Sequence, residues 1–136
     1  MRPDLDAVRT IDVPTVCDAR GALSVIEGGR HIPFPVARVF FMHHMTADRG
    51  GHAHRDTEQC ILAVAGSLRL DLTDGRGHAS HVLDDPARGL YLPPMIYLDI
   101  RDISPDAVCL VLASTPYDPA GVIRSLSAYL EAIAAP

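Results

Sequence analysis

Two histidines separated by one small residue, His52 and His54, are the side chains of this sequence best suited to chemistry. They directly follow the tripeptide Arg49-Gly50-Gly51 and precede a long apolar run. In an extended chain, successive side chains point to opposite faces, so histidines two positions apart share a face and can converge on one cavity. Neutral histidine is the commonest metal ligand, and its unperturbed pKa lies near physiological pH. The pair is therefore either half of a metal site or a proton-transfer device.

Length and composition predict one soluble domain around this pair. The 136 residues suffice for a single compact core, and we assign residues 1–136 to one domain because no linker or internal repeat is present. Hydrophobic residues make up 48% of the chain and charged residues 21%, and no apolar run approaches the roughly 20 residues of a membrane span. The polar segment Met1–Asp6 does not resemble an export signal, which predicts a cytoplasmic protein.

Charge and cysteine content argue against nucleic-acid binding and against a disulfide or zinc framework. The formal net charge of -5, from 12 basic and 17 acidic residues, lacks the basic footprint of a nucleic-acid-binding protein. It still allows a small anionic ligand held by a few local arginines. The three cysteines, Cys17, Cys60 and Cys109, are widely spaced and odd in number, which predicts reduced, mostly buried thiols rather than a disulfide or zinc framework.

The elements that must position the histidines are mostly strands. Short apolar stretches recur between Gly, Pro and Asp residues, a pattern typical of a sandwich or barrel. Strands are predicted at residues 22–27, 36–45, 59–65, 67–72, 78–83, 89–92, 96–99 and 107–114. Asp74-Gly75 predicts a hairpin, because Gly tolerates positive φ. From Pro119 onward, apolar residues recur every three to four positions, which predicts a C-terminal helix.

A series of short motifs in one order and spacing covers nearly the whole chain. The motifs are Asp18–Leu23, Ile32–Phe34, Arg38-Val39, Arg49–His54, Gln59, Gly66-Ser67, Gly89–Met95, Ser104–Val108, Leu110–Ser114, Tyr117-Asp118 and Ile123-Arg124. Together they resemble the WxcM-like cupins, which are the sugar 3,4-ketoisomerases of dTDP-deoxysugar biosynthesis. The resemblance implies a small double-stranded β-helix, or jelly-roll, barrel. It also implies a homodimer that acts on dTDP-4-keto-6-deoxyglucose without a metal or other cofactor.

In that family, the two histidines of the Arg-Gly-x-His-x-His segment are the acid/base pair, which the resemblance places on His52 and His54. Moving a ketone from C4 to C3 requires removal of the C3 proton, an enediol(ate) intermediate and return of a proton at C4. A positioned imidazole can do both, and contributes about 10²–10⁴-fold in rate. Arg38 or Arg49 could stabilise the enolate oxygen or grip the pyrophosphate through bidentate hydrogen bonds.

Other side chains are candidates for contact with the substrate. Arg20 and Arg55 are weaker candidates for holding phosphate. Glu58 could orient an imidazole, ligate a metal or pair with Arg55 at the surface. The predicted substrate-binding residues are Arg20, Arg38, Arg49, Glu58 and Tyr97. His43 and His44 are adjacent, so on a strand they face opposite ways and only one could reach a cavity.

Some pocket positions differ from the pattern that the family usually carries. The family has Tyr-Tyr after Arg-Val, whereas this chain has Phe40-Phe41, which removes two hydroxyls. Tyr97 or Tyr91 could replace them. Where Trp-His-Glu is common, this chain has Leu98 as the middle residue.

A metal site is the main alternative chemistry. Metal-binding cupins resemble this chain in having His-x-His followed about four residues later by a carboxylate, here Glu58. Leu98 stands where their last histidine would be, but three protein ligands suffice for many catalytic metals. Two other functions stay open. One is a related cupin that enolises a different small carbonyl compound of natural-product biosynthesis, and the other is a cupin that binds a sugar nucleotide without turnover.

Overall fold

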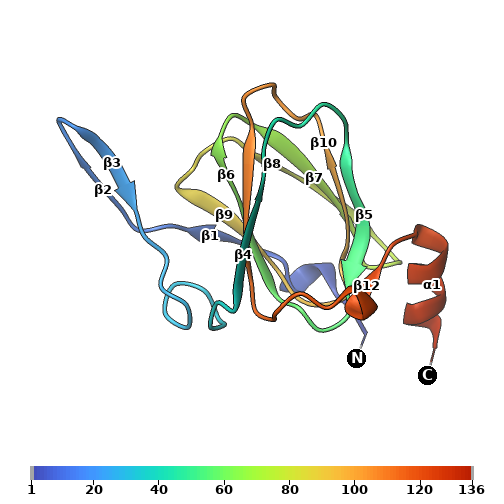
Figure 1. The fold of residues 1–136 in the computed structure, drawn as a ribbon. Helices are drawn as coiled ribbons and strands as arrows, with labels where there is room; N and C mark the ends of the chain where they lie inside the picture. Colours follow the sequence, from blue (N-terminus) through green and yellow to red (C-terminus); the bar gives the residue numbers. More distant parts are fainter. Residues whose placement is uncertain (1, 136) are drawn as a thin grey trace.

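The protein folds into two facing antiparallel sheets, with a hairpin arm on one side and a helix on the other (Figure 1). The structure is a computed structural model that describes residues 2–135, so the two ends of the predicted domain 1–136 lie outside it. The first sheet comprises, in spatial order, β1 (Arg9–Asp12), β9 (Arg88–Leu92), β6 (Gln59–Ala65), β11 (Val108–Ala113) and β4 (Arg38–Met42). The second comprises β12 (Val122–Ile123), β5 (Arg49–His54), β10 (Tyr97–Arg101), β7 (Leu68–Thr73) and β8 (His78–Leu83).

The inner faces of the two sheets share one apolar core. Strand pairing aligns Phe40 with Val111, and Val111 with Ile61, across the first sheet. On the second sheet, Leu98 and Ile100 alternate inward and are almost fully buried. Burying an aliphatic side chain of this size stabilises a fold by about 1.5–3 kcal/mol. Two facing antiparallel sheets around such a core confirm the predicted mainly β, jelly-roll barrel.

Most predicted strands are confirmed. Those at residues 59–65 and 78–83 match at both ends, and those at 67–72, 89–92, 96–99 and 107–114 shift by one or two residues. The hairpin at Asp74-Gly75 is confirmed, because β7 and β8 pair across that turn. The predicted strand 36–45 is shorter, and 22–27 is replaced by a strand at residues 21–24. Strands β1, β5 and β12, and a further strand at residues 15–18, were not predicted, since short or polar strands carry little periodic signal.

The C-terminal helix begins later than the sequence predicts. Pro119–Gly121 form a short 3-10 helix, η2, and the next two residues form β12. The α-helix α1 (Leu126–Ala134) begins after Ser125, whose hydroxyl accepts a hydrogen bond from the backbone of Ala128. The prediction of helix from Pro119 was therefore wrong, because pairing with β5 satisfies the backbone of residues 122–123 as a strand. None of the helices described within residues 2–135 is long and apolar enough to cross a membrane.

A two-stranded arm extends away from the barrel (Figure 1). It consists of β2 (Thr15–Asp18) and β3 (Gly21–Ser24), and all eight residues of these strands are exposed. Val16 and Leu23 lie opposite each other and are 69% and 64% exposed. An isolated hairpin is at best marginally stable in water, so this apolar pair is available to pack against another surface. Cys17 is exposed on the arm, whereas Cys60 and Cys109 are buried, as predicted.

Candidate active site

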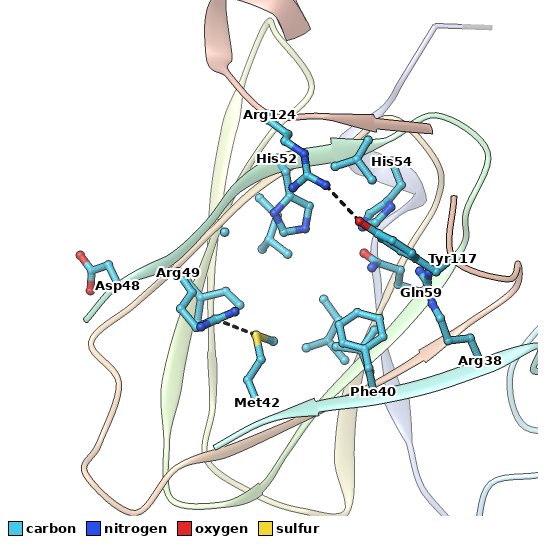
Figure 2. Close-up of a pocket in the computed structure, with 16 residues that line it drawn as sticks. Arg38, Phe40, Met42, Asp48, Arg49, His52, His54, Gln59, Tyr117 and Arg124 are labelled. Carbon is cyan, nitrogen blue, oxygen red and sulfur yellow. Dashed lines mark hydrogen bonds between the residues drawn. The ribbon is translucent and has the colours of Figure 1, made fainter. Parts of the chain in front are cut away.

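A cavity of about 640 Å³ lies between the two sheets. Its walls come from β4, β6 and β11 in the first sheet, from β5 and β10 in the second, and from residues of the 117–124 segment (Figure 2). Pockets for small molecules usually measure about 300–1,000 Å³, so a hexose can enter this one. The cavity is the place where the structure brings chemically active side chains together.

Both histidines of the His-x-His motif point into this cavity from β5 (Figure 2). The ring centroids of His52 and His54 are 5.1 Å apart, and the rings are perpendicular. Nε2 of His54 is buried and has no hydrogen-bond partner among the described residues. A buried ring nitrogen without a partner is costly in a folded protein, and it is available to a ligand. The predicted convergence of the two imidazoles is thus present.

Two glycines explain how β5 can present these rings. Gly50 and Gly51 have φ angles of +90° and +73°, which L side chains rarely adopt. A Cβ on Gly50 would lie 2.7 Å from the carbonyl oxygen of Leu98 on the neighbouring strand. The β5–β10 register shifts at this point, between Leu98 and Asp99. The glycines therefore permit an irregularity in the ladder immediately before the histidines, as bulges beside active sites often do.

The environment keeps both imidazoles uncharged near neutral pH. Burial is the main cause that lowers the pKa of His52, and the charges of Arg124 and Arg49 add to it, while Gly50 and Asp99 oppose it. Burial also lowers the pKa of His54, to about 4, with contributions from His52, Arg38 and Arg124. A neutral imidazole has a free lone pair and can accept a proton. The pair is therefore poised to act first as a base.

Three arginines and one carboxylate, Asp48, line the same cavity, and Asp48 is paired with Arg101, so the arginines give the cavity a net positive charge. Arg38 comes from β4, Arg49 from β5 and Arg124 from the link between β12 and α1. Within residues 2–135, none of the three forms an ion pair with a carboxylate, whereas six other arginines do. The guanidinium of Arg38 lies over the rings of both Phe40 and Tyr117, with its Cζ 5.2 and 5.3 Å from the ring centroids. Arginine side chains that form no ion pair with the described residues are available to bind an anionic ligand.

Among the cavity residues that the site prediction missed, three carry groups suited to hydrogen bonding with a substrate. Gln59 is buried at the start of β6 and points into the cavity, and Tyr117 and Arg124 line it from the segment after β11 (Figure 2). Each belongs to a motif of the family resemblance, but none was given a role. Arg124 could have been found by alternation from Val122, which also lines the cavity, had β12 been recognised.

A smaller cavity of about 320 Å³ adjoins the first. The two share Arg38, His54 and Tyr117 as lining residues. The smaller cavity is otherwise lined by polar side chains and backbone of the segments 56–57 and 115–121. A ligand with two linked parts could occupy both.

Arg20 is not at the cavity of its own chain. It lies at the tip of the arm, where its guanidinium is largely exposed and donates to the carboxylate of Asp18 at 2.6 Å. The prediction that it binds substrate is therefore not supported within this chain, because the β2–β3 hairpin carries it away from the barrel. Arg55 is also exposed and lines neither cavity.

Glu58 and Tyr97 also point away from the histidines, contrary to prediction. Glu58 precedes inward-facing Gln59, so it lies on the opposite face, and its Oε1 accepts a hydrogen bond from the Tyr91 hydroxyl at 2.6 Å. Tyr97 precedes inward-facing Leu98 and packs against Tyr129 outside the barrel. Neither residue lines a cavity, and neither Tyr97 nor Tyr91 replaces the hydroxyls absent at Phe40-Phe41.

The donor set does not fit the metal-binding alternative. In a metal site, Glu58 would be the third protein ligand, but its carboxylate accepts the hydrogen bond from Tyr91. Leu98 occupies the position where metal-binding cupins carry their last histidine. In the part of the chain that the structure describes, no three His, Cys, Asp or Glu side chains are grouped to hold an ion. His43 and His44 contact each other, with their Nδ1 atoms 2.6 Å apart, but both are exposed and neither reaches the cavity.

Comparison with known proteins agrees with this geometry. Residues 6–134 match the family described as FdtA, WxcM-like, C-terminal. The chain is 37% identical over 128 residues to a TDP-4-oxo-6-deoxy-alpha-D-glucose-3,4-oxoisomerase of Aneurinibacillus thermoaerophilus, and the match covers 93% of this chain and 92% of the relative.

Two solved structures share the fold closely. A 3,4-ketoisomerase from Helicobacter canadensis superimposes with a TM-score of 0.92 at 30% identity, over 95% of this chain and 98% of its own. A histidine-to-asparagine mutant of the 3,4-ketoisomerase QdtA from Thermoanaerobacterium thermosaccharolyticum, in complex with TDP-4-keto-6-deoxyglucose, gives a TM-score of 0.90 at 30% identity, over 93% of each chain. The protein therefore belongs to the WxcM-like family.

Proposed function

We propose that this protein is a TDP-4-keto-6-deoxyglucose 3,4-ketoisomerase in which His52 and His54 transfer the protons. The observation that carries the proposal is the pair of neutral imidazoles, with ring centroids 5.1 Å apart, in a hexose-sized cavity lined by three arginines that form no ion pair within residues 2–135. The curated relative is named for this oxoisomerase reaction, and a related ketoisomerase has been crystallised with this keto sugar.

The reaction needs no external oxidant, because it moves two electrons between adjacent carbons of one sugar. A neutral imidazole takes the proton from C3, which the C4 carbonyl acidifies, and O4 acquires a proton to give an enediol. The O3 hydroxyl then loses its proton as C4 receives one, which leaves the ketone at C3. Because both imidazoles face the cavity from one strand, two adjacent ring carbons lie within reach of the pair.

Arg38 and Arg49 bind the anionic part of the substrate in this proposal. Arg38 borders both cavities, so a diphosphate placed beside it can connect a sugar at the histidines to a nucleoside in the smaller cavity. Its guanidinium is held by two aromatic rings rather than by a carboxylate, which leaves its N–H groups free for bidentate contacts. Arg49, whose Nε donates to the sulfur of Met42, adds positive charge on another wall.

The acid limb of the pH profile is expected to lie below pH 6.5. The pKa of each imidazole is lowered from that ordinary value, so the neutral base persists as pH falls and is lost only on passing through the lowered pKa. The pH dependence of kcat/KM reports the free enzyme's pKa values and is the measurement that checks this. An acid limb above 6.5 would mean that burial does not control these groups. Circular dichroism across the same range separates titration from acid unfolding.

Turnover separates this function from the two other candidates. Purified protein incubated with TDP-4-keto-6-deoxyglucose in heavy water should incorporate deuterium at the reacting carbons, as followed by NMR. A binding cupin without catalysis would bind TDP, as measured by calorimetry, with no exchange. An enzyme for a different carbonyl compound would leave this sugar unchanged and bind TDP weakly. Either result would contradict the proposed reaction.

We also propose that the protein is a homodimer, as the family resemblance implied. The outer face of the first sheet carries exposed Val39, Phe41 and Val64, and Phe41 continues a row of apolar side chains through Leu110. The arm presents a further apolar pair, Val16 and Leu23. Monomeric proteins seldom expose large contiguous apolar patches, and a second copy offers the same surfaces by symmetry.

Charge placed on the arm is expected to shift the protein toward monomer. A Val16→Asp, Leu23→Asp double variant buries two carboxylates if the arm packs against a second copy, which is unfavourable. Light scattering after size exclusion should give twice the chain mass for the wild type and a lower mass for the variant. Val82→Asp is the matched control, because Val82 is 65% exposed on β8, in the other sheet. A monomeric wild type would contradict the homodimer.

A further inference from the structure

The 117–124 segment brings a third cation to the histidines from the far end of the chain. Strand β12 pairs with β5 so that Val122 lies opposite His54 and Ile123 opposite Ala53. Continuing this antiparallel register brings residue 124 beside His52. Val122 lines the cavity while Ile123 is buried on the other side, and Arg124 again lines the cavity. Figure 2 shows its guanidinium directly beside the His52 ring.

Arg124 is the arginine whose charge reaches both imidazoles. It lowers the pKa of His52 and of His54, whereas Arg49 acts on His52 and Arg38 on His54. Among the described residues it has no carboxylate partner, so its charge is not neutralised within the chain. A cation beside both proton-transfer groups is also beside the two carbons on which they act.

The Tyr117 hydroxyl holds Arg124 in this place. Nη2 of Arg124 donates to the Tyr117 oxygen at 3.3 Å, and the Tyr117 ring lies over the Arg38 guanidinium (Figure 2). The hydroxyl is a neutral acceptor, so it can orient the guanidinium without cancelling its charge. A carboxylate in the same position would orient Arg124 equally well but would consume the charge.

We propose that Arg124 stabilises the enediolate intermediate and that Tyr117 positions it for this role. The inference rests on the proposed ketoisomerase function. In the enediolate formed by loss of the C3 proton, the negative charge lies mainly on O4, and it passes to O3 when a proton moves between these two adjacent oxygens, which lie in the plane of the reacting carbons. The parallel N–H groups of a guanidinium match two adjacent oxygens, whereas a lysine ammonium supplies only a point charge. Arg124 acts on the developing charge and does not itself accept or release the C3 proton.

Three substitutions at two positions test this assignment with TDP-4-keto-6-deoxyglucose as substrate. Arg124→Gln should lower kcat by about 10²–10³-fold, the usual loss when one donor to a developing oxyanion is removed. TDP affinity measured by calorimetry should change little, because charge on the diphosphate is not the proposed target. Arg124→Lys should recover part of kcat, since charge is restored without the paired N–H geometry. Tyr117→Phe should lower kcat by roughly tenfold or less, because only the orienting hydrogen bond is lost.

The pH profile gives a readout that a purely structural role would not change. Loss of the Arg124 charge raises the pKa of both imidazoles, so the acid limb of kcat/KM should move toward pH 6.5 in Arg124→Gln and stay in place in Tyr117→Phe. Arg55→Gln is the matched control, because Arg55 is exposed and borders neither cavity. It should match the wild type in kcat and in pH profile.

The outcomes separate this inference from the proposed function. If the wild type turns over and Arg124→Gln keeps its kcat, or loses only TDP affinity, Arg124 is not the group that stabilises the enediolate. If the wild type itself leaves the keto sugar unchanged, the proposed function fails instead. Should Arg124→Gln not fold, the kcat and acid limb of Arg124→Lys decide, since full wild-type kcat there would contradict the need for paired N–H groups.

Discussion

Replacing His52 with asparagine is expected to lower kcat by about 10²–10⁴-fold, the contribution of one positioned acid/base group. Asparagine keeps polarity and approximate size at this position of β5, but its amide cannot accept a proton from carbon. His52 lies in the cavity beside Arg124 and 5.1 Å from His54. Because neither the arginines nor the cavity walls change, TDP affinity should stay near the wild-type value. Steady-state kinetics, calorimetry and deuterium exchange at C3 are the three measurements.

His43→Asn is the matched control for this substitution. His43 is exposed at the end of β4 and contacts His44 rather than the cavity, so its loss should leave turnover unchanged. His54→Asn should also lower kcat, although its effect on exchange at C3 depends on which ring takes the first proton. Deuterium exchange at C3 that persists at the wild-type rate in His52→Asn would remove His52 from the role of first base.

Replacing Tyr129 with alanine is expected to destabilise the protein by about 3–5 kcal/mol, the range for removal of a buried aromatic side chain. Tyr129 is fully buried and packs against Tyr97, and its hydroxyl donates to the carbonyl oxygen of Met95 at 2.7 Å. It is the buried residue of α1, a few positions after Arg124, and it packs this helix against the barrel together with Ala132 and Ile133. Urea unfolding followed by circular dichroism measures the loss, and Tm should fall by roughly 10–15 °C.

Tyr129→Phe separates the ring from the hydroxyl. It keeps the packing against Tyr97 and removes the hydroxyl that donates to the carbonyl oxygens of Met95, at 2.7 Å, and Thr73, at 3.2 Å, so the expected loss is about 1–2 kcal/mol. Equal loss in both variants would mean that the hydrogen bond, and not burial of the ring, holds α1 in place. Exposed Leu130 on the same helix is a control, because Leu130→Ala should change stability little.

Local patterns correctly predicted that His52 and His54 face one cavity. The placement of His52 and His54 on one face requires only that the chain be extended, since strand alternation is a property of the backbone itself. The same locality explains the Asp74-Gly75 hairpin and the strands over 59–65 and 78–83. A structural feature that depends only on residues close together in the chain can be predicted from the sequence alone.

Which face of each strand points into the barrel could not be predicted in the same way. Glu58 and Tyr97 are each one residue away from an inward-facing neighbour, Gln59 and Leu98, and therefore point outward. A shift of one residue moves every side chain of a strand to the opposite face, and only packing against the other sheet decides which face is buried. The motif located these residues near the cavity but not on the strand face that lines it.

The sequence by itself determined a mainly β chain, a paired imidazole on one strand face and the glycines that precede it. Only the tertiary structure decided which cations meet that pair. Arg38, Arg49 and Arg124 come from three distant segments, and Arg124 arrives through the two-residue pairing of β12 with β5. A strand of two residues is too short to show a periodic pattern in the sequence. Its backbone hydrogen bonds and its burial both depend on the barrel that it joins.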